Sequence, residues 1–105
     1  MRLEHYPAEK LKREILAIIG RHLDLRHYRV FFFGSRVAGT ADERSDIDVG
    51  IEGLGPVPTE AWLDIQEEIE NLPSLYKVEI VDFRRTADVF RAVALQHTED
   101  VSPPK

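Results

Sequence analysis

The stretch that decides the fold is Phe33-Gly34-Ser35-Arg36-Val37-Ala38-Gly39-Thr40, followed four residues later by Ser45-Asp46-Ile47-Asp48-Val49. The first half closes an aromatic and β-branched run, residues 28–33, which predicts a buried strand stopped by a glycine. The second half alternates polar with apolar residues, which predicts a half-buried strand. Side chains two apart on a strand point to the same face, so Asp46 and Asp48 should project together.

Such a pair of carboxylates has a physical cost that suggests a ligand. Two like charges this close are unfavourable unless a shared proton or a bound cation compensates them. Mg²⁺ in proteins is typically held by one or two carboxylates together with substrate phosphates. Taken alone, residues 42–48 also fit a solvated acidic turn or an EF-hand loop, but they lack the residue order and glutamate spacing of the EF-hand. Their position after Gly34-Ser35 favours a ligand site.

Gly34-Ser35 has the composition of a phosphate-binding turn. Glycine lets the backbone turn sharply and approach a ligand closely. The Ser35 hydroxyl and the following N–H groups can donate to phosphate oxygens, especially if a helical turn starts there. If the two strands are neighbours, a triphosphate held at this turn would reach the carboxylates through a metal ion.

A third acid is expected on a later strand, residues 77–83, where Glu79 and Asp82 must point to opposite faces. Only one of them can join the metal site. Glu79 is the candidate, with a solvated strand residue as the alternative interpretation. Asp82 is expected to be structural, capping the turn that follows it.

The remaining elements complete an α/β (α+β) domain. Apolar residues at helical spacing predict a first helix over Leu11 to Leu23, a second that begins with Thr59 as its cap, and a last one over about Thr86–Gln96. The order of elements suggests a small mixed sheet of about three strands with helices packed on it. We expect one domain over residues 1–97 and a flexible tail over 98–105, which contains two consecutive prolines.

The composition limits the kinds of ligand and partner to be expected. The 105 residues carry a formal net charge of −5 with acidic and basic residues interspersed, which disfavours a polymeric nucleic-acid ligand. There is no cysteine, so disulfides and thiolate chemistry are excluded. No apolar stretch approaches the roughly 20 residues that span a bilayer, and the first residues lack the apolar run of a signal peptide. We therefore expect no membrane association and a cytoplasmic location.

The motif Gly34-Ser35, then Asp46-x-Asp48, then an acid on another strand, resembles the polymerase-β-type nucleotidyltransferase superfamily. The similarity is greatest to its smallest members, the minimal nucleotidyltransferases (MNT proteins) that pair with HEPN proteins. It extends over residues 31–90.

This resemblance implies a polymerase-β-like fold and a set of site residues. Asp46 and Asp48 would coordinate Mg²⁺, with two ions expected, and Gly34, Ser35 and Arg36 would bind the nucleotide. Glu79 would be the third catalytic and metal-binding carboxylate, at a position where MNT relatives usually carry Asp. Aminoglycoside nucleotidyltransferases of the same superfamily use a glutamate as base, so this departure does not imply loss of activity.

The resemblance also implies a function. ATP would be the donor, and AMP would be transferred to a tyrosine of an all-helical HEPN-type toxin, which makes this chain a type VII-like antitoxin. Two alternatives stay open: an antitoxin that neutralises its partner by binding alone, and a transferase that acts on a small molecule such as an aminoglycoside. The sequence leaves open a homo-oligomer or a hetero-oligomer.

Overall fold

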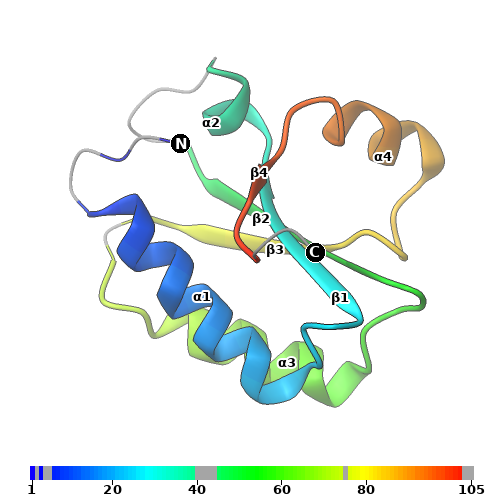
Figure 1. Cartoon of the computed structure of the whole chain (residues 1–105), viewed down its shortest axis with the longest axis horizontal. Helices are drawn as coiled ribbons and strands as arrows, with labels where there is room; N and C mark the ends of the chain where they lie inside the picture. The colour runs from blue at the N-terminus through cyan, green and yellow to red at the C-terminus, as the bar shows by residue number, and fades with distance from the viewer. Residues whose placement is uncertain (2, 4–5, 40–44, 75, 103–105) are drawn as a thin grey trace.

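In this computed structural model the chain forms a four-stranded mixed sheet with helices on both faces (Figure 1). The structure describes residues 1–105 except 2, 4–5, 40–44, 75 and 103–105. The strands lie side by side in the order β3-β2-β1-β4. In chain order, the elements are α1 (Ala8–His22), β1 (Tyr28–Phe33), α2 (Ser35–Ala38), β2 (Ile47–Gly53), α3 (Thr59–Glu70), β3 (Val78–Asp82), α4 (Asp88–Ala94) and β4 (Glu99–Asp100).

The predicted aromatic strand, β1, lies inside the sheet. It pairs antiparallel with β2 on one side and with β4 on the other, while β2 and β3 are parallel. Its last four residues are all buried, because helices cover both faces of the sheet here. Side chains alternate between the faces: Val30 and Phe32 join the large core, and Phe31 and Phe33 join a separate aromatic cluster. A strand buried on both faces therefore appears in the sequence as an unbroken apolar run.

Helices α1 and α3 cover one face of the sheet (Figure 1). The buried side of α1 carries the predicted periodic residues Leu11, Ile15, Ile18 and Ile19. Helix α3 contributes Ile65 and Ile69 to the same core. The predicted cap was wrong: Thr59 is the first residue of α3 itself, and Pro58 precedes it without a side-chain capping bond.

The opposite face is covered by α4 (Figure 1). Beneath this helix, Phe83 contacts the rings of Phe31 and Phe33 edge to face, at 5.0 Å between centroids in each case. Phe90 of α4 meets the ring of Phe33 at 6.1 Å. Arg91 of α4 forms a half-buried ion pair with Glu52 of β2. Aromatic packing and one ion pair thus fix α4 over this face.

The sheet has a fourth strand that the sequence did not predict. Residues 99–102, which were expected to belong to a flexible tail, supply β4 and two buried residues, Val101 and Ser102. The N–H groups of Val101 and Ser102 both donate to the carbonyl of Val30, at 3.0 Å. A two-residue strand of acidic residues has no recognisable local pattern, since it is held by bonds to a distant strand. Residues 103–105 of the expected tail lie outside the described part.

Within the described residues, no helix combines the length and the apolar character needed to cross a bilayer.

Candidate functional site

The turn at Gly34 joins β1 to the first residue of α2. Gly34 has φ 84° and ψ −161°, a conformation that residues with a Cβ rarely adopt. The N–H groups of Val37 and Ala38 donate to the Gly34 carbonyl at 3.2 and 3.0 Å, so a helical turn does begin at Ser35. A Cβ at Gly34 would lie 2.2 Å from Oδ2 of Asp48. The backbone of the predicted phosphate turn therefore lies directly against a predicted metal-binding carboxylate.

Asp48 stands between two neighbouring strands at the end of the sheet where the predicted site residues meet. In the register of the sheet it pairs with Phe33 of β1 on one side and with Glu79 of β3 on the other. Burial raises the pKa of the Asp48 carboxyl, and the negative charges of Glu79 and Asp46 raise it further. The pKa shift reflects negative charge gathered around a partly buried carboxylate, which is an arrangement that a bound cation would stabilise.

Glu79, and not Asp82, shares a face with Asp48. Ile47 and Val49 on either side of Asp48 point into the large core, as do Val78 and Ile80 on either side of Glu79. Because side chains alternate along a strand, Asp48 and Glu79 both belong to the face that α4 covers.

Asp82 lies on the other face, where it is 5% exposed. Its carboxylate accepts hydrogen bonds from the N–H groups of Val57 at 2.8 Å and Arg84 at 3.0 Å. These bonds confirm the structural role predicted for it, capping the turn after β3.

One cation already lies beside the carboxylates. Lys77 Nζ is 3.2 Å from Oε1 of Glu79. The pKa of Lys77 is raised by its hydrogen bond to Glu79 and by the charges of Glu79 and Asp46. Among the described residues, no three His, Cys, Asp or Glu side chains are arranged as a ready metal-binding cluster. Two carboxylates plus substrate phosphates are nevertheless a usual ligand set for Mg²⁺.

Arg36 supports the site from α2. Its Nε donates to the carbonyl of Ser45 at 2.8 Å, and its guanidinium lies 4.8 Å from the ring centroid of Tyr76. The first contact holds the chain immediately before Asp46, and the second places Arg36 beside the segment that leads into β3. The nucleotide contact expected of Arg36 stays a prediction. Thr40 and the acidic turn at residues 41–44 lie outside the described residues.

A hollow of about 390 Å³ opens beside the turn, between α2 and α4. Gly34, Ser35 and Asp48 form one part of its wall. The sequence did not predict the other part, which comes from α4 and the residues after it: Phe90, Val93, Ala94, Gln96 and His97. The signal in the sequence was the number of large apolar residues in this short helix: Val89, Phe90 and Val93 are all exposed in the folded protein.

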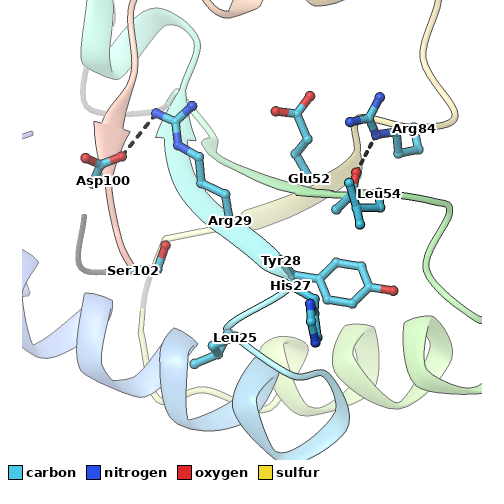
Figure 2. A pocket seen from close by; sticks show the side chains of 10 residues that line it. Leu25, His27, Tyr28, Arg29, Glu52, Leu54, Arg84, Asp100 and Ser102 are labelled. Carbon is cyan, nitrogen blue, oxygen red and sulfur yellow. Dashed lines mark hydrogen bonds and ion pairs between the residues drawn. The ribbon is translucent and has the colours of Figure 1, made fainter. Parts of the chain in front are cut away.

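A second hollow, of about 470 Å³, lies at the opposite end of β1 (Figure 2). Its wall includes Tyr28 and Arg29 at the start of β1, and Arg29 pairs with Asp100 of β4 at 3.1 Å. Arg84 Nε donates a hydrogen bond to the carbonyl of Gly53, and a dashed line marks this bond at Arg84 in Figure 2. None of the predicted site residues lines this hollow.

Known proteins share this architecture. The chain is 32% identical over 85 residues to the "Probable protein adenylyltransferase MntA" of Haemophilus influenzae. The aligned region covers 79% of this chain and 75% of that protein. Among solved structures, a toxin–antitoxin complex with AMP-PNP superposes with a TM-score of 0.68 at 20% identity, covering 90% of this chain and 74% of the other.

Two further solved structures share the fold of this chain. A Shewanella oneidensis complex of a tri-AMPylated HEPN toxin with an MNT antitoxin gives a TM-score of 0.64 at 17% identity, over 91% of this chain and 73% of the other. A structure described as "putative minimal nucleotidyltransferase" gives a TM-score of 0.61 at 28% identity, over 96% of this chain and 99% of the other. The family model described as polymerase beta, nucleotidyltransferase, matches residues 25–101, which include every predicted site residue. The chain therefore belongs to the polymerase beta nucleotidyltransferase family.

Proposed function

We propose that this chain is a Mg²⁺-dependent protein adenylyltransferase that transfers AMP from ATP to a tyrosine of a HEPN-type partner and acts as its antitoxin. The observation that carries the proposal is the contact of the Gly34 backbone with the Asp48 carboxylate, with Glu79 in register beside it. A protein that neutralised its partner by binding alone would need neither a glycine in this conformation nor carboxylates that repel one another.

The proposed chemistry assigns each residue a task. Gly34 and Ser35 hold the triphosphate, with Arg36 near its phosphates. Asp46 and Asp48, with Glu79 for a second ion, hold Mg²⁺, which would neutralise the charge that develops on the phosphates. The acceptor hydroxyl oxygen forms a bond to the α-phosphorus, the bond from that phosphorus to the bridging oxygen breaks, and pyrophosphate leaves. Glu79 takes the proton of the hydroxyl, which requires Lys77 to move from its present contact.

The acceptor is inferred from the relatives. One relative is described as a protein adenylyltransferase, and one solved complex contains an AMPylated HEPN toxin. The described part of this chain forms a single small sheet and no second domain that would hold an acceptor. A separate protein would supply the acceptor hydroxyl and complete the site.

The test is to co-express the chain with the product of the adjacent gene, add Mg²⁺ and each NTP in turn, and weigh both proteins by mass spectrometry. We expect AMP additions on the partner with ATP and Mg²⁺, and none in the Asp46→Asn, Asp48→Asn double variant. That variant should still fold, because the raised pKa of Asp48 means that the folded state disfavours its charged form. Transfer by the double variant would rule out this site.

The same experiment distinguishes the alternatives. A tight complex without any change of mass would indicate neutralisation by binding. Transfer to an aminoglycoside and not to the partner would indicate a small-molecule transferase. Glu79→Gln should lower turnover more than ATP affinity. Unchanged turnover would mean that another residue acts as the base.

A further inference from the structure

We propose that the hollow between α2 and α4 is the nucleoside subsite of the enzyme, with the ring of Phe90 as the surface on which the base stacks. This inference rests on the proposed function, because it assumes that a nucleoside triphosphate binds at Gly34-Ser35. It gives a function to the exposed apolar side of α4, which has no role in binding the phosphates or the metal.

Position is the first argument. The hollow shares Gly34, Ser35 and Asp48 with the candidate catalytic site, so a ligand whose phosphates contact that turn has its remaining part beside the hollow. Its volume of about 390 Å³ lies within the usual range of ligand pockets, roughly 300–1,000 Å³.

The chemistry of the wall is the second argument. Most of it is apolar: Phe33, Ala38, Phe90, Val93 and Ala94. A wall of this kind would not stabilise the charges of a triphosphate, since buried charges need paired partners. An aromatic base attached to ribose matches it better, with Gln96 and His97 as polar groups at the edge.

Phe90 has the properties of a stacking surface. Phe90 is 44% exposed as a residue, yet its ring lies beside the rings of Phe33 and Phe83, at 6.1 and 6.0 Å between centroids. A half-exposed ring that other rings fix in place offers a flat apolar surface and loses little side-chain entropy when a ligand binds.

The order of the strands argues against the acceptor as occupant. Glu79, the proposed base, lies on β3, and the Gly34-Ser35 turn follows β1, with β2 and Asp48 between them. An acceptor that attacks beside Glu79 therefore approaches from the β3 side. The hollow lies on the other side, between the turn and α4.

The test compares the binding of ATP and of inorganic tripolyphosphate, both with Mg²⁺, by isothermal titration calorimetry. Phe90→Ala should weaken ATP binding at least about fivefold, the lower end of the loss when a stacking aromatic is removed from a base. Tripolyphosphate, which has no nucleoside, should bind as tightly as to the wild type. Phe90→Leu, which keeps most of the apolar volume under α4, should show the same selective loss if Phe90→Ala perturbs the fold.

Val89→Ala provides the matched control. Val89 precedes Phe90 on the same helix and is 79% exposed, but it does not line the hollow. Its substitution should leave the binding of both ligands unchanged.

The other outcomes distinguish a failure of the nucleoside subsite from a failure of the proposed function. Unchanged ATP affinity in the Phe90 variants, or equal weakening of both ligands, would overturn the nucleoside subsite alone. The same holds if transfer to the partner is lost while ATP affinity is kept, which would assign the hollow to the acceptor. A wild-type protein that binds neither ligand would overturn the proposed function itself, and this inference with it.

Discussion

At the scale of single residues, the site depends on close contact between a turn and a carboxylate. Gly34 is required twice over, by its positive φ and by the space that Asp48 occupies. Asp48 in turn carries a raised pKa because it is partly buried and lies near Asp46 and Glu79. The folded protein tolerates this unfavourable charge arrangement, as sites that bind cations often do.

Gly34→Ala should both destabilise the fold and displace Asp48. Backbone strain at this conformation costs about 1–3 kcal/mol, and the added Cβ would clash with the carboxylate. We expect urea unfolding to show a loss of at least that size, together with loss of ATP binding.

Two glycines serve as controls for that substitution. Gly39 also has a positive φ, 82°, in the left-handed helical region, and a Cβ there meets nothing within 4 Å, so Gly39→Ala tests the strain of that region without a clash. Gly55→Ala tests neither and should change the free energy of unfolding by less than about 0.5 kcal/mol. If Gly34→Ala lost no more than Gly39→Ala and kept ATP binding, the contact with Asp48 would be irrelevant.

At the scale of elements, the short strand β4 holds one edge of the central strand. Ser102 Oγ accepts a hydrogen bond from the N–H of Val30 at 3.1 Å, and Val101 is buried in the large core. Lys12 of α1 pairs with Glu99 at 2.9 Å. The last described residues therefore connect β1 with α1.

Truncation after Thr98 should consequently destabilise the protein, in contrast to the removal of a free tail. Burial of a valine contributes about 1.5–3 kcal/mol and each hydrogen bond about 0.5–1.5 kcal/mol. We expect the free energy of unfolding to fall by at least about 2 kcal/mol in urea titrations, the sum of the lower limits for the valine and one hydrogen bond. Truncation after Ser102 is the matched control and should have little effect. Equal stability of the two truncated proteins would show that β4 contributes nothing.

At the scale of the whole molecule, opposite charges are paired at many places in the described part of the chain. Many of the described arginines lie beside carboxylates: Arg21 with Glu68, Arg26 with Asp24, Arg29 with Asp100, Arg85 with Asp82 and Arg91 with Glu52. The net charge of −5 adds a long-range repulsion toward nucleic acids.

We therefore expect no appreciable affinity for polymeric nucleic acid. Fluorescence polarisation of labelled single-stranded RNA and duplex DNA at physiological salt should show no saturation up to about 100 µM protein, the weak limit of non-specific binding. Addition of ATP and Mg²⁺ should still raise the thermal midpoint in the same buffer. Salt-dependent binding in the micromolar range would instead indicate a nucleic-acid ligand.

The sequence by itself determined the elements whose signals are local. The apolar run of β1, the periodic residues of α1 and the Gly34-Ser35 turn were recognisable because burial and backbone conformation act within a few neighbouring residues. The alternation in β3 likewise required that Glu79 and Asp82 face opposite ways.

Only the tertiary structure decided which distant residues meet. It placed Glu79 in register with Asp48, paired residues 99–100 with β1, and brought Phe90 and His97 to the wall beside Ser35. These contacts depend on the pairing order of the strands and on the packing of α4 over the aromatic cluster. No short segment encodes them, because they arise from interactions between parts of the chain that are far apart in sequence.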